Sequence, residues 1–194
     1  MTKSIDFYFD FISPYSYLAH KKIKENTEKK YINFNYKPIL VGGLHNLQGI
    51  TPPALIKPKL KYMISDCNLI AKKANFDFIW NSKFPINSLL IMRGYLFINE
   101  DIKDLYLNIM FDAYWKNNLD ISNEEILITL LKKCKINLDS FLVGVKDLKI
   151  KDELKKVTQE AHDKEIFGAP TFVVNGKIFW GQDRLEFALD EYRK

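Results

Sequence analysis

Ser13-Pro14-Tyr15-Ser16 is the stretch of sequence that decides the fold of this chain. It follows the alternating apolar run Ile5-Asp6-Phe7-Tyr8-Phe9-Asp10-Phe11, which predicts a strand from Ile5 to Phe9. The residues after it, Tyr17-Leu18-Ala19-His20, predict an amphipathic helix from Tyr15 to Thr27. Enzymes that exchange disulfides carry Cys-x-x-Cys at such a strand–turn–helix junction, and here both cysteine positions are serine.

A serine hydroxyl cannot exchange disulfides, but at a helix N-terminus it can hydrogen-bond an anion. The free N–H groups and the macrodipole favour negative charge at the same place. If the anion is the thiolate of a bound thiol cofactor, the motif belongs to an enzyme that borrows its sulfur. The alternative is an N-cap at Ser13 with Pro14 at the first helical position, which requires no function. These residues alone leave both interpretations open.

The composition is that of a chain with a full hydrophobic core. Its 194 residues are 47% hydrophobic and 27% charged, which fits one elaborated domain or two intimate subdomains. The net charge is +5, but the basic residues are spread along the chain and alternate with apolar residues at helical spacing. This pattern favours solvated helix faces over a nucleic-acid surface.

Two cysteines and three histidines give no sign of a metal site. Cys67 and Cys134 are far apart within apolar runs, so we expect buried free thiols and a reducing compartment. His20, His45 and His162 lack the spacing of metal ligands. No export signal or membrane-spanning run is visible. We therefore expect a cytoplasmic protein with no metal and no membrane or nucleic-acid partner.

The first half of the chain continues with a strand and then changes to helical periodicity. A second strand from Tyr31 to Ile39 completes a βαβ unit, whose strands should be parallel. Val41-Gly42-Gly43 breaks the pattern, and Thr51-Pro52-Pro53 begins a loop. From about Ala54 to Lys164 the signal is helical. The predicted helices run over Lys59 to Asn75, Ser88 to Asn99, Ile102 to Lys116, a segment that starts at the capping box Ser122-Asn123-Glu124-Glu125, and Asp152 to Lys164.

The β signal returns near the C-terminus. Thr171-Phe172-Val173-Val174 and Lys177-Ile178-Phe179-Trp180 flank Asn175-Gly176, a strong hairpin signal, and a closing helix runs from Arg184 to Tyr192. The order βαβ, helical block, ββα predicts an α/β, thioredoxin-like fold interrupted by a large all-helical insertion. We predict a thioredoxin-like domain over 1–50 plus 165–194 and an inserted helical domain over 51–164.

Gly168-Ala169-Pro170-Thr171 lies just before the hairpin. In a thioredoxin fold this proline is cis, and the residue before it presents its main chain beside the first helix. An extended γ-glutamyl-cysteinyl-glycine peptide could pair with Ala169 as an added strand. The alternative is a trans proline that begins an edge strand.

Trp180-Gly181-Gln182-Asp183-Arg184 precedes the last helix. Its N–H groups could hold a carboxylate while Asp183 pairs with an amino group. The γ-glutamyl end of glutathione carries both groups. The alternative is that Asp183 only caps the helix.

These motifs together resemble a known family. They are Phe9-Asp10-Phe11-Ile12-Ser13-Pro14-Tyr15-Ser16-Tyr17-Leu18-Ala19, Pro38-Ile39-Leu40-Val41-Gly42-Gly43-Leu44, Pro52-Pro53, Phe84-Pro85-Ile86-Asn87-Ser88, Met92-Arg93-Gly94, Phe167-Gly168-Ala169-Pro170-Thr171-Phe172 and Trp180-Gly181-Gln182-Asp183-Arg184-Leu185. In this order they resemble 2-hydroxychromene-2-carboxylate isomerases and the related kappa-class glutathione transferases, within the DsbA-like thioredoxin group. The resemblance covers nearly the whole chain.

The resemblance implies glutathione as the cofactor and a homodimer as the assembly. Ser13 matches the serine that hydrogen-bonds and activates the glutathione sulfur. The other implied cofactor contacts are Lys59, Ala169, Pro170, Trp180, Gly181, Gln182 and Asp183.

The positions that face the second substrate depart from the family pattern. Ile50 stands where the kappa class has asparagine, and Pro53 and Ala54 stand at a later polar contact. His45, followed by Asn46, stands where some isomerases place a substrate-binding lysine. We expect His45, Asn46 and Tyr15 to contact the substrate.

Three hypotheses about function follow. The leading one is a glutathione-dependent isomerase that acts on an aromatic or unsaturated carbonyl compound by reversible thiolate addition. The second is a kappa-type glutathione transferase or peroxidase, which consumes glutathione. The third is a non-catalytic thioredoxin-fold module that binds peptides or a partner protein.

Overall fold

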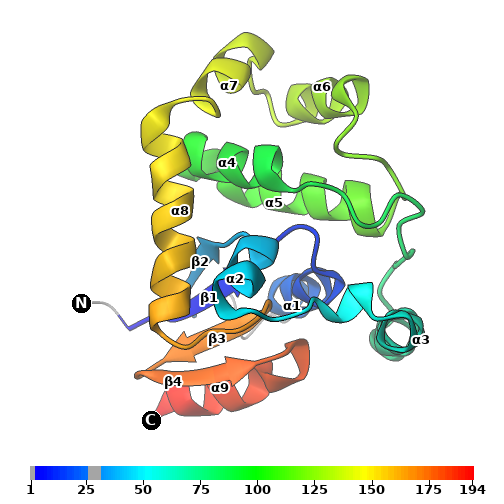
Figure 1. Ribbon diagram of the computed structural model, residues 1–194, viewed down its shortest axis with the longest axis vertical. Helices are drawn as coiled ribbons and strands as arrows, with labels where there is room; N and C mark the ends of the chain where they lie inside the picture. Colours follow the sequence, from blue (N-terminus) through cyan, green and yellow to red (C-terminus); the bar gives the residue numbers. More distant parts are fainter. Residues whose placement is uncertain (1–2, 26–31) are drawn as a thin grey trace.

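A four-stranded mixed sheet forms the centre of the lower half of the molecule (Figure 1). The computed structural model describes residues 3–25 and 32–194. The strand order is β2-β1-β3-β4, with β1 (Ile5–Phe9) parallel to β2 (Phe34–Pro38) and antiparallel to β3 (Thr171–Val174). The hairpin partner of β3 is β4 (Lys177–Trp180), as the Asn175-Gly176 signal predicts. The predicted thioredoxin-like α/β fold with a helical insertion is confirmed.

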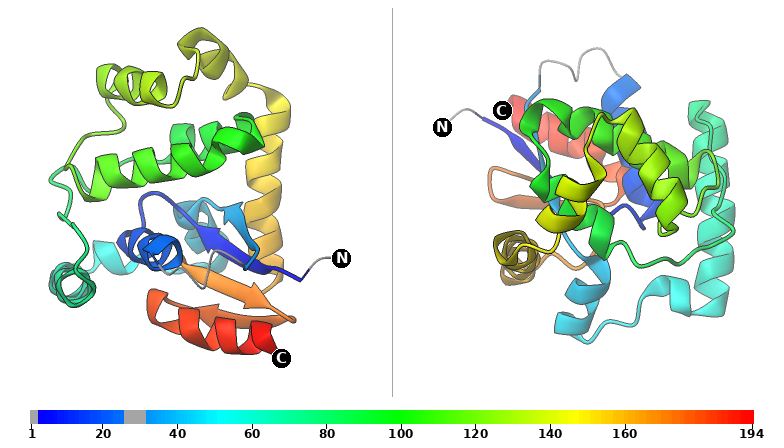
Figure 2. Two further views of the ribbon diagram at one scale, coloured as in Figure 1. Left: turned by 180° about the vertical axis from the view of Figure 1, so that it is seen from behind. Right: turned by 90° about the horizontal axis from the view of Figure 1, so that it is seen from above.

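Helices cover both faces of the sheet and extend well above it (Figure 1). In chain order they are α1 (Pro14–Glu25), α2 (Val41–Gln48), η2 (Pro53–Leu55), α3 (Lys57–Ala74), α4 (Leu89–Phe97), α5 (Glu100–Trp115), α6 (Glu124–Lys133), α7 (Leu138–Gly144), α8 (Leu148–Asp163), η3 (Gln182–Arg184) and α9 (Leu185–Arg193). Figure 2 shows that α3 and α8 lie on opposite sides of the molecule.

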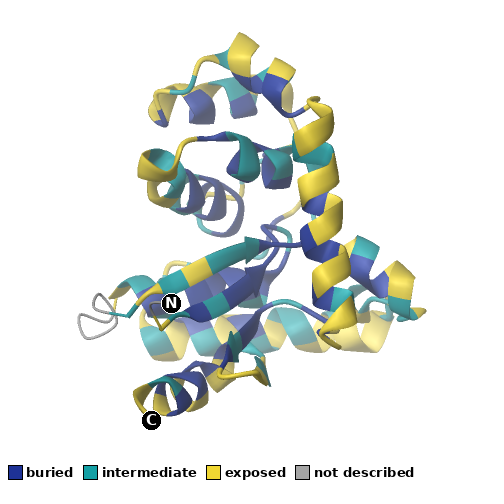
Figure 3. Ribbon diagram, turned by 90° about the vertical axis from the view of Figure 1, so that its left-hand side faces the viewer, coloured by how far each residue is buried: buried dark blue, intermediate teal, exposed yellow. Residues whose placement is uncertain are grey.

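The central strand β1 is buried on both faces, which its nearly unbroken apolar sequence favours. Phe7 and Phe9 point into the main core, where Phe172 of β3 stacks on Phe7 with ring centroids 5.1 Å apart. Tyr8 points to the other face, into a smaller cluster with residues of α2 and α8. In Figure 3 the inner strands β1 and β3 are accordingly mostly buried, whereas the edge strands β2 and β4 are mostly intermediate or exposed.

The helical block shares its core with the sheet. The ring of Phe111 on α5 lies 4.8 Å from Phe11 and 6.0 Å from Phe9, measured between centroids. The helix α8 runs back from the outer helices to the sheet, where Val157 and Ala161 join the cluster around Tyr8. The predicted domain limits at 50/51 and 164/165 therefore separate segments that pack together.

Two helices were not individually predicted from the sequence. The Val41-Gly42-Gly43 segment, interpreted as a break, is the first turn of α2, and α7 lies within the predicted helical block, where its bounds were not predicted. The helix α6 was predicted, but its cap is Asn123, whose side chain accepts the Ile126 N–H, and not Ser122. The predicted ends at Thr27 and Tyr31 lie outside the described residues.

Candidate active site

A cavity of about 980 Å³ opens where the end of β1 meets α2, α3 and the segment before α4. Its volume is at the upper end of the range for small-molecule sites. Most of its lining is apolar. The lining residues are Asp10, Ile12, Ser13, Pro14, Tyr15, Leu40, Val41, Gly42, Gly43, His45, Ile50, Pro52, Pro53, Ala54, Leu55, Pro58, Lys59, Tyr62, Met63, Phe84, Pro85, Ile86, Asn87, Ser88, Leu89, Phe167, Gly168, Ala169 and Trp180.

Ser13 lies in this cavity at the N-terminus of α1. Its Oγ accepts the Ser16 N–H at 3.1 Å, which is the geometry of a helix cap. The same hydroxyl donates to the carbonyl oxygen of Ala169 at 2.9 Å, across 156 residues of sequence. The bond between Ala169 and Pro170 is cis. Ser13 therefore caps the helix and also contacts the proline loop.

Two main-chain donors remain next to the Ser13 hydroxyl. Among the described residues, neither the Tyr15 N–H nor the Ala169 N–H has a hydrogen-bond partner. Both residues line the cavity. Free N–H groups in the first turn of a helix favour a bound anion, and a free N–H beside an extended loop favours an added strand. This end of the cavity can hold an anionic group that has a peptide attached.

Asp10 is a site residue for which the sequence analysis predicted no role. It is 1% exposed, and its carboxylate accepts the Val41 N–H at 3.0 Å and the Ile12 N–H at 3.2 Å. A further hydrogen bond comes from Ser88. Burial raises the pKa of Asp10 to about 6, and these hydrogen bonds oppose the rise. One carboxylate thus joins three walls of the cavity.

His45 and Asn46 differ in position because α2 is a helix. His45 is buried, lines the cavity and has no hydrogen-bond partner at Nδ1 among the described residues. Burial lowers its pKa, against a hydrogen bond with the Phe167 main chain, so the ring is neutral at pH 7. Asn46, one residue further round the helix, is exposed and does not line the cavity. Contact between Asn46 and the substrate stays a prediction.

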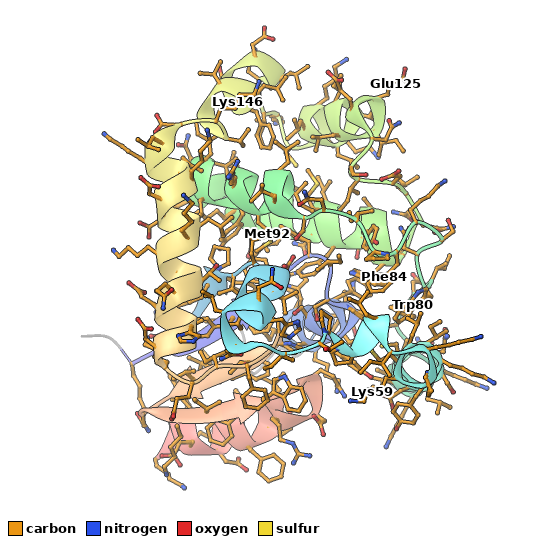
Figure 4. The ribbon with its side chains drawn as sticks, in the orientation of Figure 1. Lys59, Trp80, Phe84, Met92, Glu125 and Lys146 are labelled. Atoms are coloured by element: carbon orange, nitrogen blue, oxygen red, sulfur yellow. The ribbon has the colours of Figure 1, made fainter. Side chains whose placement is uncertain are left out.

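Tyr15 and Lys59 lie where α1 and α3 border the cavity. The Tyr15 hydroxyl donates to Asp66 Oδ2 at 2.8 Å, so this hydroxyl is already engaged. The ring is the part of Tyr15 that remains for contact with a ligand. Lys59 is exposed in the first turn of α3 and is labelled in Figure 4. It is the one cation among the described lining residues.

Trp180 borders the cavity at the end of β4. It is 52% exposed and packs on Phe167, with ring centroids 4.9 Å apart. A Cβ at Gly168 would lie 2.7 Å from Trp180 Nε1, so only glycine lets the indole approach this closely. The indole and the Phe167 ring form an aromatic rim beside Ala169.

Gln182 and Asp183 lie outside the described lining of the cavity, just beyond Trp180, and their contact with the γ-glutamyl end of the cofactor stays a prediction. Gly181, with φ of 113°, turns the chain away, and a short 3-10 turn follows. The Gln182 side chain accepts a hydrogen bond from Lys22, and the Asp183 carboxylate pairs with Arg184 at 2.8 Å. Gly181 and the buried Pro170 also lie outside the lining.

The two cysteines are buried free thiols, as predicted. Burial raises the pKa of Cys67 to about 12 and that of Cys134 to about 11, so neither is a thiolate at neutral pH. Across residues 3–25 and 32–194 no cluster of three or more histidine, cysteine or acidic side chains could hold a metal ion. The same residues contain no helix with the length and apolarity to cross a bilayer.

Comparisons with known proteins agree with this geometry. The family model of the DSBA-like thioredoxin domain matches residues 4–193. A 2-hydroxychromene-2-carboxylate isomerase of Sphingobium xenophagum is 29% identical over 198 residues, which cover 99% of this chain and 98% of the relative. Glutathione S-transferase kappa 1 of Caenorhabditis elegans is 27% identical over 203 residues, which cover 96% of this chain and 89% of the relative.

A solved 2-hydroxychromene-2-carboxylate isomerase has the same fold. It superposes with a TM-score of 0.87 at 24% identity, and the match covers 96% of this chain and 92% of that one. The resemblance inferred from the sequence motifs is thus confirmed, and the named relatives are enzymes. The chain belongs to the family of DSBA-like thioredoxin domains.

Proposed function

We propose that this protein is a glutathione-dependent isomerase of the 2-hydroxychromene-2-carboxylate isomerase type, acting on an aromatic or unsaturated carbonyl compound. The observation that carries the proposal is the Ser13 hydroxyl, which lies at a helix N-terminus in a cavity whose described lining contains no cysteine. Thiol chemistry at such a site would use the sulfur of a bound thiol, because the described lining supplies none. The isomerase and kappa transferase relatives support the same class of chemistry.

The residues present fit glutathione at the thiol end of the molecule. The Ser13 hydroxyl and the Tyr15 N–H would face the sulfur, and the free Ala169 N–H would pair with the cysteinyl unit. Lys59 would meet a carboxylate of glutathione at the rim of the cavity. Bound glutathione would supply a thiolate that adds reversibly to an unsaturated carbon, which permits bond rotation or ring opening.

Ser13 would stabilise this thiolate by changing its own hydrogen bond. Its hydroxyl proton, donated to the Ala169 carbonyl at 2.9 Å, turns toward the sulfur. Its Oγ keeps accepting the Ser16 N–H, so the helix cap is retained. A hydrogen bond to an ion together with the helix N-terminus lowers the pKa of a thiol.

The test replaces Ser13 with alanine and follows bound glutathione by its ultraviolet thiolate absorbance. We expect the thiol pKa to rise by about 1–2 units, since a hydrogen bond to an ion contributes about 1.5–3 kcal/mol. Turnover of an aromatic enone should fall at least tenfold. The matched control is Ser16→Ala, because the Ser16 hydroxyl is buried without a partner in the described structure. An unchanged pKa and turnover in Ser13→Ala would reject the proposed role.

Kappa-type conjugation or peroxide reduction is the second candidate. The volume of about 980 Å³ leaves room for two molecules, and the kappa relatives favour it. Measuring whether glutathione is consumed with a chlorinated aromatic, or survives with an aromatic enone that can isomerise, separates the two reactions. If calorimetry detects no glutathione binding, the remaining hypothesis is a binding module.

We also propose that the protein is a cytoplasmic homodimer, as the family resemblance suggests. Equilibrium sedimentation of the purified chain tests the assembly. A monomer at micromolar concentration would contradict it.

A further inference from the structure

The charges of the cavity bear on which second substrate it accepts. Its described lining includes two ionisable residues that carry charge at pH 7, Asp10 and Lys59, and one neutral histidine, His45. The rest of the lining is uncharged and rich in proline, aliphatic and aromatic side chains. Lys59 is therefore the one positively charged side chain that this described lining offers to an anionic group, beside the main-chain N–H groups of Tyr15 and Ala169 that the proposed function assigns to glutathione.

Lys59 is exposed at the start of α3, and the proposed function assigns it to a carboxylate of glutathione. With glutathione in place, no cation among the described lining residues is left for a second molecule. His45 cannot replace it, because burial lowers its pKa and keeps the ring neutral. Asn46 is exposed on the outer side of α2 and carries no charge.

Asp10 adds a repulsive element. It remains ionised above about pH 6, and its oxygens already accept hydrogen bonds from Ile12, Val41 and Ser88. A carboxylate placed in an apolar chamber without a partner loses its hydration and gains no ion pair. A second anion in the same chamber would also be repelled by Asp10.

The uncharged lining suits a flat molecule. The rings of Tyr15, Tyr62 and Phe84 and the Phe167–Trp180 rim offer aromatic surfaces from α1, α3, the segment before α4 and β4. Phe84 is labelled in Figure 4. Aromatic side chains favour stacked or edge contacts with planar ligands.

We infer that the second substrate is an uncharged, planar unsaturated carbonyl compound and that the cavity discriminates against its carboxylate analogues. This inference rests on the proposed function, since it assigns Lys59 to glutathione. It separates this chain from relatives whose name specifies a carboxylate substrate. Specificity of this kind arises from the lack of a cation for the carboxylate as much as from the contacts that bind the uncharged compound.

The test uses 2-naphthamide and 2-naphthoate, which have the same shape and differ in charge. Each is titrated by calorimetry into the protein saturated with S-methylglutathione at pH 7.5. We expect the amide to bind at least tenfold more tightly than the acid. Equal affinity, or preference for the acid, would overturn the inference.

Two matched variants locate the effect in the cavity. Ile50→Lys adds a cation to the lining and should reduce the preference for the amide at least threefold. Val143→Lys adds the same charge at an exposed position of α7 outside the cavity lining and should leave the preference unchanged. If both variants shift the ratio equally, the overall charge of the protein sets the preference, and the inference fails.

Failure of the proposed function gives a different result from failure of this inference. If S-methylglutathione does not bind, the glutathione assignment is wrong and Lys59 is available to the ligand. Lys59→Met then removes that cation, and the variant should still prefer the amide at least tenfold. Loss of the preference in Lys59→Met would overturn the account of the cavity itself.

Discussion

Ser13 caps α1 and Ser16 lies in the first turn of that helix, yet their hydroxyls have different surroundings. The Ser13 hydroxyl makes two hydrogen bonds at the edge of the cavity. The Ser16 Oγ is buried and has no partner in the described structure. The two positions of the motif are therefore not equivalent, although the sequence presents them as a symmetrical pair.

Replacement of Ser16 by alanine should stabilise the protein by about 1 kcal/mol. The change removes an unsatisfied buried hydroxyl and introduces the best helix former. Ser13→Ala should destabilise it by about 1 kcal/mol, because the helix cap is lost. Urea denaturation of both variants measures the difference. A loss of stability in Ser16→Ala would show that its hydroxyl has a partner in solution.

Asp10 predicts a specific pH dependence of stability. Its pKa of about 6 in the folded protein exceeds the ordinary value of 3.8, so the folded state binds the proton more tightly between these values. Ionisation of Asp10 therefore destabilises the fold as pH rises from about 4 to about 6, and this cost is constant above pH 6.

Asp10→Asn abolishes this titration. As pH rises from 4 to 7.5, the free energy of unfolding of the variant should increase by about 2 kcal/mol relative to that of the parent protein, since the pKa shift is about two units. Urea denaturation of both proteins at the two pH values checks the change. A stability difference independent of pH would contradict the raised pKa.

Among the secondary-structure elements, the sequence predicted the ones whose local signals are strong. The strands β1, β3 and β4 were predicted to the residue, because alternation and Asn175-Gly176 specify them. The helix α2 was missed because Gly42 and Gly43 disfavour a helix. The first N–H of this helix, that of Val41, donates to the carboxylate of Asp10, which is distant in the sequence. No local sequence pattern contains such a tertiary contact. The positions of His45 and Asn46 could not be predicted without this helix.

The cap of α6 provides a test at the same scale. Asn123 accepts the Ile126 N–H at 3.2 Å, while Ser122 bonds to Asp120 in the preceding turn. Asn123→Ala should destabilise the protein by about 1 kcal/mol and Ser122→Ala by less than half of that. Thermal denaturation of the two variants compares them. The reverse order would restore Ser122 as the cap that the capping-box pattern indicates.

The whole molecule combines two segments of sequence in one core. We propose that the domain limits at 50/51 and 164/165 separate two topological units that unfold together as one cooperative unit. Phe9 and Phe11, at and just after the end of β1, contact Phe111 of the insertion, and α8 completes the cluster under Tyr8. The sequence predicts the insertion from its change of period, but periodicity does not reveal which helix faces meet the sheet.

Amide hydrogen exchange tests this at the scale of the molecule. If the core is shared, the slowest amides of β1 and α5 should exchange with the same free energy of opening, within about 1 kcal/mol. The exposed α3, with Cys67 and Ala71 as its buried residues, should open at lower free energy. A β1 more protected than α5 by several kcal/mol would indicate two independently stable domains.

The burial of both thiols has a consequence for how the protein responds to oxidising conditions. An enzyme with cysteine at positions 13 and 16 could be trapped as a mixed disulfide with the oxidised form of its own cofactor. This chain has two cysteines in all, and both are enclosed in the core as neutral thiols. Oxidation of the surrounding thiol pool would therefore deprive the protein of reduced cofactor without modifying the protein, and activity should return in full as soon as the pool is reduced.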